Sequence, residues 1–288
     1  VLTTYDDPAP GVMGGIRRGL ALSCATAGEI DLVLHGTTLA TNAIIERRGA
    51  VTALLATAGH RDAGEMAFEN RFEQYDVNID RPAPLVRRQL RLPVPERLDA
   101  AGRVLLPLDL DAVRGLMPQL QAGGVQSVAV GFLHSYVNPE HEQAVGTLLE
   151  AEMPGLSVTL SSDVCPEIRE YERLSTACAN AYVKPLMARY LHSLQDQLRA
   201  LGIAGPVLMM TSGGGLTTLD TAARFPIRLV ESGPAGGAIL AARVAAEGGY
   251  RRVLSFDMGG TTAKICLIDD AEPLLSRSFE VDRTYRFK

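Results

Sequence analysis

The stretch VLSFDMGGTTAKICLI, residues 253–268, constrains the fold most, because it places a polar, glycine-rich turn between two short apolar segments. Residues 253–256 and 263–268 are rich in β-branched and apolar side chains, which predicts two buried strands joined by a hairpin. A Walker-type loop would end in Gly-Lys-Ser/Thr before a helix, and a dinucleotide-binding loop would read Gly-x-Gly-x-x-Gly. The stretch matches neither of these patterns.

The polar residues of this hairpin suit a phosphate group. Gly259 and Gly260 permit positive φ and let backbone N–H groups approach an anion closely, while Thr261 and Thr262 add hydroxyl donors. Asp257 ends the first strand, where a carboxylate suits the magnesium ion that accompanies a phosphate, through a water molecule. A Gly-Gly pair also forms tight hairpin turns without any ligand. The motif alone leaves both interpretations open.

The segment before the hairpin, ESGPAGGAILAARVAAEGGYRR, predicts a helix over residues 233–247 whose alanines leave one side nearly bare. Its start, which includes Gly233 and Gly236, exposes free N–H groups at the positive end of the helix dipole. Glu231 and Ser232 precede this start and either position water or magnesium or cap the helix. The order of turn, small-residue helix, strand, hairpin and strand resembles the actin-like ATPase superfamily.

Composition limits the class of protein. The length of 288 residues suggests two domains. A content of 47% hydrophobic residues indicates a globular chain. The net charge of −5 makes the chain mildly acidic, which does not favour nucleic acid as a partner. Four widely spaced cysteines form no Cys-x-x-Cys pair, which fits a reducing cytoplasm. We find no signal peptide and no run long enough to cross a membrane. The start VLTTYDDPAP lacks an initiator Met and predicts a fragment.

Helix and strand patterns alternate along the rest of the chain, as in layered α/β domains. Helices are predicted at residues 11–27 and 41–49, and a third helix is predicted to begin after Asn138, which would cap it. Strands are predicted at residues 31–35, 51–59, 157–160 and 206–210. Residues 61–97 predict a long irregular excursion followed by a strand or two. Leucines at 191, 194, 198 and 201 have helical spacing and predict a core-facing stripe.

Three further groups of residues are candidates for a site. His35 ends a predicted strand, where α/β folds place binding sites, although a lone histidine is more often a hydrogen-bonded structural residue. Thr37, Thr38 and Asn42 form either a polar substrate pocket or the cap of the following helix. Three consecutive glycines cost backbone entropy without packing gain, which predicts a functional turn and phosphate contact at Ser212, Gly213, Gly214 and Gly215.

Several distinctive strings together resemble the hydantoinase A and 5-oxoprolinase family over nearly the whole chain. They are HGTTLATNAIIERRGA, VGFLHSYVNPEHE, REYERLSTACANAYVKP, MMTSGGGL, ESGPAGG and FDMGGTTAK. The resemblance implies an α/β, actin-like (ribonuclease H-like) ATPase fold with two lobes of mixed sheets flanked by helices. The lobes are expected at residues 1–175 and 176–288.

The resemblance also implies a reaction, cofactors and a partner. It implies the ATP- and Mg²⁺-dependent opening of a cyclic amide such as hydantoin, N-methylhydantoin or 5-oxoproline. Phosphoryl transfer to the amide oxygen would activate the ring carbon toward water. In that reaction Asp257, His35 and Glu231 are the expected catalytic residues, and a hydantoinase B type subunit is the expected partner, with no nucleic acid or membrane involved. The alternatives are an ATP-dependent ketone carboxylase subunit and a nonenzymatic actin-like nucleotide switch.

Two departures from the family pattern limit what this chain does alone. The family's first phosphate hairpin and its adenosine-binding segment have no counterpart here, so we expect no ATP turnover by this chain alone. Position 264 is lysine where many family members carry an acid, so a second metal-binding carboxylate is not expected there. Lys264 either contacts phosphate or points outward from an exposed strand edge.

Overall fold

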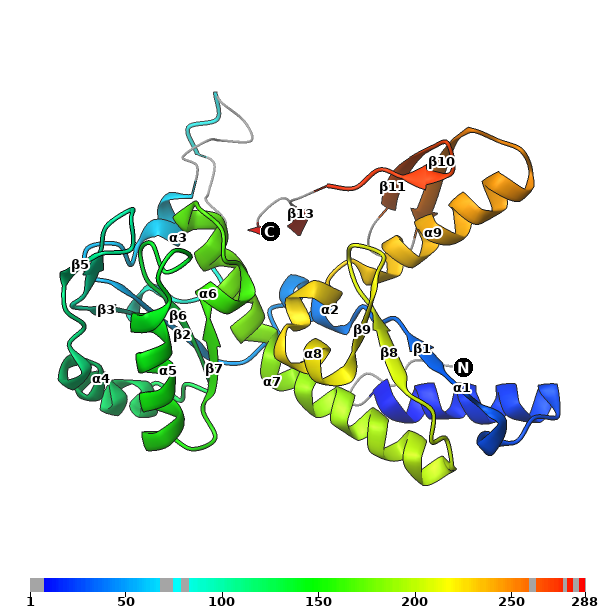
Figure 1. Cartoon of the computed structure of the whole chain (residues 1–288), viewed down its shortest axis with the longest axis horizontal. Coiled ribbons are helices and arrows are strands. Elements are labelled where there is room, and N and C mark those ends of the chain that lie inside the picture. The colour runs from blue at the N-terminus through cyan, green and yellow to red at the C-terminus, as the bar shows by residue number, and fades with distance from the viewer. Residues whose placement is uncertain are drawn as a thin grey trace. The chain divides into compact units, whose positions relative to one another are not determined.

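A computed structural model describes residues 8–67, 75–78, 83–258, 263–276, 279–281 and 285–287. The chain divides into two compact units. Unit 1 comprises Val1–Asn42 and Leu186–Ser276, and unit 2 comprises Ala43–Pro185 and Arg277–Lys288. Helix α7 (Glu170–Leu201) belongs to both units, and the boundary falls at Pro185 within it. Figure 1 labels the helices and strands of both units.

Unit 1 contains a three-stranded sheet in the order β1-β8-β9. Strand β1 (Val33–His35) runs parallel to β8 (Val207–Met210), and β9 (Leu216–Thr218) runs antiparallel to β8. Because β1 and β8 are parallel, the residues that follow them emerge at the same edge of the sheet. The other elements of this first part of unit 1 are α1 (Pro8–Ser23), η1 (Ala27–Glu29), α2 (Leu39–Ile45), α8 (Leu219–Arg224) and η3 (Pro226–Leu229).

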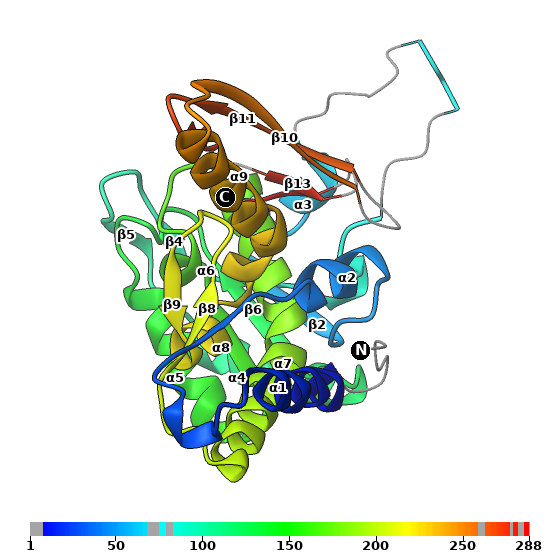
Figure 2. The ribbon, with the colours of Figure 1, turned by 90° about the vertical axis from the view of Figure 1, so that its right-hand side faces the viewer.

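The second part of unit 1 is helix α9 (Ser232–Glu247) against a sheet of three strands in sequence order. Strands β10 (Arg252–Met258) and β11 (Ala263–Asp269) pair antiparallel, and β12 (Glu272–Pro273) follows β11. Both figures show α9 alongside β10 and β11 (Figures 1 and 2). Ala238, Ala242 and Ala245 of α9 are buried, which confirms the predicted alanine side of this helix.

The two strands around the glycine-rich turn confirm the predicted strand-hairpin-strand unit, but the prediction that both are buried is wrong. Leu254 and Phe256 of β10 are 55% and 57% exposed, and Ile265 of β11 is 63% exposed. Side chains alternate between the two faces of a strand, and α9 packs on only one of them. The apolar sequence predicted burial, whereas the described chain supplies nothing to cover the second face.

Unit 2 is built on a four-stranded, all-parallel sheet in the order β3-β2-β6-β7. Strands β2 (Thr52–Thr57) and β6 (Ser127–Gly131) occupy its centre and are buried along their whole length, as central parallel strands are. The edge strands are β3 (Arg91–Val94) and β7 (Ser157–Leu160). Leu55, Val130 and Phe132 belong to the core of this unit, together with Leu149 of helix α5 (Glu140–Glu152).

The remaining elements of unit 2 are two small sheets and several helices. Strands β4 (Arg97–Leu98) and β5 (Val104–Leu106) form a separate two-stranded sheet, as do β13 (Phe279–Val281) and β14 (Tyr285–Phe287). The helices are α3 (Ala63–Met66), η2 (Arg88–Leu90), α4 (Leu110–Ala122) and α6 (Ser161–Val164). No helix among the described residues is both long and apolar enough to cross a membrane.

Most predicted elements form, with shifted ends. Strand β7 has the predicted bounds, and the stripe of Leu191, Leu194 and Leu198 on α7 is buried as predicted. Helix α1 covers Pro8–Ser23 instead of 11–27, because prolines fit the first turn of a helix and Cys24 adopts φ 53°. Helix α2 begins and ends earlier than predicted, since Arg47 adopts φ 57°. The predicted division at residue 175 stays a prediction.

Candidate functional site

The edge formed by the ends of β1 and β8 brings two predicted motifs together in unit 1. His35 pairs with Met209 in the parallel register, so the HGTT segment and the TSGGG segment leave the sheet side by side. The sequence separates these segments by about 170 residues, and the parallel pairing joins them. Every described residue predicted for the site belongs to unit 1.

The start of helix α2 supplies the threonine and asparagine side chains. Thr37 Oγ1 accepts a hydrogen bond from the backbone N–H of Leu39 at 3.1 Å, which is a capping interaction. The Asn42 side-chain amide lies 3.5 Å from Thr38 Oγ1, at the limit of a hydrogen bond. These contacts give Thr37 a structural role, and its predicted role in substrate binding stays a prediction.

The start of helix α9 meets the start of α2 through two hydrogen bonds. The backbone N–H of Glu231 donates to Thr41 Oγ1 at 3.2 Å, and the Ser232 hydroxyl donates to the carbonyl of Thr37 at 3.2 Å. Glu231 itself is held in the left-handed region, at φ 66° and ψ 16°. A non-glycine residue in this region costs about 1–3 kcal/mol and is found where the surrounding structure fixes it. The starts of the two helices are therefore joined at one corner.

The hairpin adds a charged group to this corner. Asp257 and Lys264 are opposite each other in the β10–β11 register, and Lys264 Nζ lies 2.6 Å from Glu231 Oε2. About a quarter of each side chain of the Lys264–Glu231 pair is exposed. Lys264 therefore turns toward the start of α9, which excludes the alternative that it points outward from the strand edge. Its contact with phosphate stays a prediction. The four turn residues between the strands, Gly259, Gly260, Thr261 and Thr262, lie outside the described residues.

The first turn of α9 carries glycines and backbone donors that can be compared with the needs of an anion. The first N–H groups of a helix have no partner within it. At the start of α9, Pro234 has no N–H, and the N–H groups of Glu231 and Ala235 donate to Thr41 Oγ1 and to the Glu231 carbonyl, so Ser232 and Gly233 supply the donors. A Cβ added at Gly237 would meet no atom within 4 Å, and one added at Gly233 or Gly236 would lie 3.8 Å from its nearest neighbour. Backbone donors, open space and the Lys264 ammonium group suit the binding of an anion.

A metal ion finds less support in the described chain. Among the residues that the structure describes, no three histidine, cysteine, aspartate or glutamate side chains gather as a metal site requires. Asp257 is exposed, and the nearby Glu231 carboxylate is paired with Lys264. Asp257 alone suits a magnesium ion that keeps most of its water and is bound mainly by substrate phosphates.

The SGGG run forms the hairpin turn between β8 and β9. The Gly214 N–H donates to the carbonyl of Thr211 at 3.0 Å, and the Thr211 N–H donates to the carbonyl of Gly215 at 2.9 Å. Gly214 adopts φ +79°, and a Cβ there would lie 2.9 Å from Ile239 of α9. The turn therefore requires a glycine at position 214, whereas Gly213 has open space around it. The predicted phosphate contact of this turn stays a prediction.

His35 has a partner that the sequence did not reveal. Its Nε2 lies 2.7 Å from the hydroxyl of Tyr190, a buried residue of α7 that is 155 residues away. Burial lowers the pKa of His35 below its ordinary value of 6.5, so the imidazole is neutral at pH 7. This contact agrees with the structural interpretation of His35 and leaves a neutral ring at the sheet edge.

The lowered pKa of His35 predicts a pH dependence of stability. Below about pH 6.5 the unfolded chain binds a proton at this position that the folded chain resists, so the free energy of unfolding decreases as pH falls. Urea denaturation between about pH 7.5 and pH 5.5 measures the effect. His35→Gln keeps a hydrogen-bonding group beside Tyr190 and removes the titration.

The stability of His35→Gln is expected to fall less over the same interval. His60, whose pKa burial also lowers, contributes equally to both proteins and cancels in the comparison. Equal slopes for the two proteins would show that His35 is not the group responsible.

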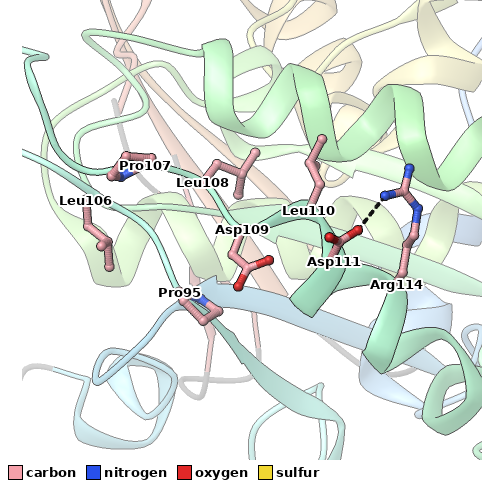
Figure 3. Close-up of a pocket in the computed structure, with 8 residues that line it drawn as sticks. All are labelled: Pro95, Leu106, Pro107, Leu108, Asp109, Leu110, Asp111 and Arg114. Carbon is pink, nitrogen blue, oxygen red and sulfur yellow. Dashed lines mark hydrogen bonds and ion pairs between the residues drawn. The ribbon is translucent and has the colours of Figure 1, made fainter.

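A pocket of about 610 Å³ lies elsewhere, in unit 2, and contains none of the predicted site residues. Figure 3 shows its lining, which joins the segment after β5 to the first turn of α4. Sequence reasoning missed it, because its residues carry no motif and meet only through the fold.

Comparison with known proteins agrees with this architecture. Residues 1–153 match the model of the hydantoinase/oxoprolinase N-terminal region, and residues 173–287 match that of hydantoinase/oxoprolinase. Caprolactamase subunit alpha of Pseudomonas jessenii is 34% identical over 262 residues, covering 88% of this chain and 38% of the relative. The acetophenone carboxylase gamma subunit of Aromatoleum aromaticum is 34% identical over 273 residues, covering 88% of this chain and 36% of that subunit.

A solved structure extends the likeness to the fold. The crystal structure of the ATP-dependent caprolactamase from P. jessenii superposes with a TM-score of 0.83 at 32% identity, over 92% of this chain and 39% of that chain. This likeness confirms the predicted α/β, actin-like fold class. The chain thus spans less than half the length of the relatives it matches. With family models matching most of its length, the chain belongs to the hydantoinase/oxoprolinase family.

Proposed function

We propose that this chain is part of the nucleotide-binding subunit of an ATP-dependent enzyme that opens cyclic amides, such as hydantoin, N-methylhydantoin, 5-oxoproline or a similar lactam. The observation that carries the proposal is the corner of α2 and α9, where Lys264 of the β10–β11 hairpin pairs with Glu231 at the start of α9, in a family with ATP-dependent members; Asp257 lies opposite Lys264 in the strand register. Groups of this kind bind and orient phosphates.

ATP, when bound, supplies the phosphoryl group that activates the amide oxygen of an otherwise unreactive ring. In our proposal the first-turn amides of α9, with Ser232, Gly233 and Gly236, hold the phosphates, and the glycines of the two hairpin turns approach them closely. Lys264 adds positive charge toward the phosphoryl oxygens, and Glu231 holds its ammonium group in place. Asp257 binds the magnesium ion through water.

In our proposal the edge of the β1-β8-β9 sheet, where β1 and β8 end, holds the cyclic amide ring. Thr37, Thr38 and Asn42 offer hydroxyl and amide groups that can hydrogen-bond a cyclic amide, and their positions are fixed by the α2–α9 corner. His35 stays neutral and orients the amide or the attacking water by a hydrogen bond. Addition of water at the activated carbon, cleavage of the ring C–N bond and release of phosphate complete the reaction.

A second candidate is an ATP-dependent ketone carboxylase subunit, because the acetophenone carboxylase gamma subunit matches this chain as closely as caprolactamase subunit alpha does. Since both relatives are named as subunits, we propose a hetero-oligomer with a hydantoinase B type chain. A cytoplasmic location follows from the need for ATP and agrees with the four free cysteines. A nonenzymatic nucleotide switch is the third possibility.

The test is phosphate release by the full-length protein with its hydantoinase B type partner, screened against hydantoins, lactams and ketones with and without bicarbonate. We expect release that depends on a cyclic amide, with ring-opened product in equal amount, and no turnover by the 288-residue chain alone. Release that requires a ketone and bicarbonate would favour the carboxylase. Nucleotide binding without turnover on any substrate would favour the switch.

A further inference from the structure

The hydrogen bond between His35 and Tyr190 can run in two directions. A phenol hydroxyl donates or accepts, and a neutral imidazole carries its proton on one of its two nitrogens. If Tyr190 donates, Nε2 of His35 accepts and the imidazole proton is on Nδ1. If Tyr190 accepts, the proton is on Nε2 and Nδ1 carries a lone pair. The direction therefore decides whether His35 offers a donor or an acceptor at its other nitrogen.

Two observations favour donation by Tyr190. The distance from its hydroxyl oxygen to Nε2 of His35 is 2.7 Å, which is shorter than the mode of about 2.9–3.0 Å for N–H donors and typical of a hydroxyl donor. In a neutral pair the phenol is also the stronger acid, and the imidazole nitrogen is the stronger base. Because burial lowers the pKa of His35, the ring is neutral at pH 7 and has a nitrogen that can accept.

Tyr190 is held firmly enough to orient the histidine ring. It lies in the part of α7 that belongs to unit 1, and it is only 5% exposed. The centroids of the His35 and Tyr190 rings are 5.9 Å apart, and the ring planes are tilted by 45°. A buried side chain on a long helix keeps its position, so its hydroxyl fixes both the orientation and the tautomer of the histidine it contacts.

The second nitrogen of His35 is open to a ligand. No residue that the structure describes forms a hydrogen bond with Nδ1 of His35. This atom is not one of the buried polar atoms that lack a partner, so water or a ligand can reach it. His35 ends β1, and Thr37 and Thr38 follow it before α2. With its proton on Nδ1, the ring presents an N–H donor at this edge of the sheet.

We propose that Tyr190 is a positioning residue that fixes His35 as the Nδ1–H tautomer, and that this N–H donates to a carbonyl oxygen of the cyclic amide. The inference rests on the proposed function for the identity of that ligand. It narrows the role of His35, because a ring with its proton on Nδ1 and its Nε2 bound to Tyr190 has no lone pair left for the attacking water. His35 therefore orients and polarises the amide and is not a general base.

Nitrogen NMR of the full-length protein with isotope-labelled histidine tests the tautomer. The signals of His35 are identified by their loss in His35→Gln. In the wild type we expect a protonated Nδ1 and an unprotonated Nε2. Tyr190→Phe keeps the aromatic ring but removes the hydroxyl, so its His35 should shift toward the Nε2–H tautomer that free histidine favours. Tyr182→Phe is the matched control and should change nothing, since Tyr182 lies on the same helix, is 8% exposed and belongs to unit 2.

Turnover by the full-length protein with its hydantoinase B type partner tests the contact with the substrate. Tyr190→Phe is expected to lower kcat/KM for the cyclic amide by about tenfold, which is roughly the effect of losing one well-placed hydrogen bond. Tyr182→Phe should change kcat/KM by less than about twofold. Circular dichroism of both variants should match the wild type, because phenylalanine fills the space of the tyrosine ring.

Each result decides the proposal. A wild-type proton on Nε2 would overturn it, and that measurement depends on no variant being stable. An unchanged tautomer in Tyr190→Phe would show that another group fixes the ring. The expected tautomer with a kcat/KM no lower than that of Tyr182→Phe would show that the Nδ1–H does not contact the substrate. Absence of turnover by the wild-type pair on every cyclic amide would overturn the proposed function and the ligand of His35, while the NMR signals would still decide the role of Tyr190.

Discussion

Asp257→Asn in the full-length protein is expected to lower substrate-dependent phosphate release by about 10- to 100-fold. Losses of this size are typical when a residue that hydrogen-bonds the ligands of a metal ion, rather than the ion itself, is replaced. Asp257 is exposed at the end of β10, opposite Lys264, so its amide analogue fits without repacking. The loss should appear mainly in kcat, and raised magnesium should restore part of it if the carboxylate acts through the ion.

The matched control for this prediction is Asp270→Asn in the same unit. Asp270 directly follows β11, at the end of that strand away from the hairpin turn, and its carboxylate pairs with Arg251. The hydrogen bond from Arg251 lowers the pKa of Asp270. Asp270 and Arg251 are both exposed, so their ion pair contributes little to stability. Asp270→Asn should therefore leave phosphate release unchanged. Equal activity of Asp257→Asn and the wild type would remove Asp257 from the mechanism.

The second large effect concerns folding of unit 2. Glu142 of α5 is fully buried, and its carboxylate accepts hydrogen bonds from the backbone N–H groups of Phe132 and Ser162, each at 2.8 Å, and from the Ser161 hydroxyl at 2.7 Å. These donors follow β6 and β7, so one side chain joins the ends of two strands. Glu142→Ala would leave buried donors unpaired and is expected to cost about 3–5 kcal/mol of unfolding free energy.

Urea denaturation followed by circular dichroism measures this loss. Glu150→Ala, at an exposed position of the same helix, should change stability by no more than about 0.5 kcal/mol. A loss of stability in Glu142→Ala no larger than in Glu150→Ala would show that water or a neighbouring group replaces the carboxylate.

Local patterns predicted much of the fold. The β10–β11 hairpin follows from two apolar segments around a glycine-rich turn, and the buried alanines of α9 follow from their spacing. The leucine stripe of α7 and the bounds of β7 were also correct, because periodicity and turn chemistry act over a few residues. The motif strings identified the family, and the fold class came with them.

Contacts between distant segments decided the rest. The Lys264–Glu231 ion pair, the His35–Tyr190 hydrogen bond and the junction of α2 with α9 each join residues that no local pattern relates. The sequence also predicted burial for β10, and the exposure of its outer face depends on which elements cover a sheet.

The sequence by itself determined the secondary structure around the motifs and the identity of the family, because these depend on residues close together in the chain. Only the tertiary structure decided which candidates meet. Parallel pairing of β1 with β8 brings HGTT beside TSGGG, and packing of α9 on its hairpin turns Lys264 toward Glu231. The same distinction explains Glu142, whose place in the first turn of a helix is typical of an exposed residue. Its burial arises because the ends of β6 and β7 present unpaired donors that only a buried acceptor can satisfy.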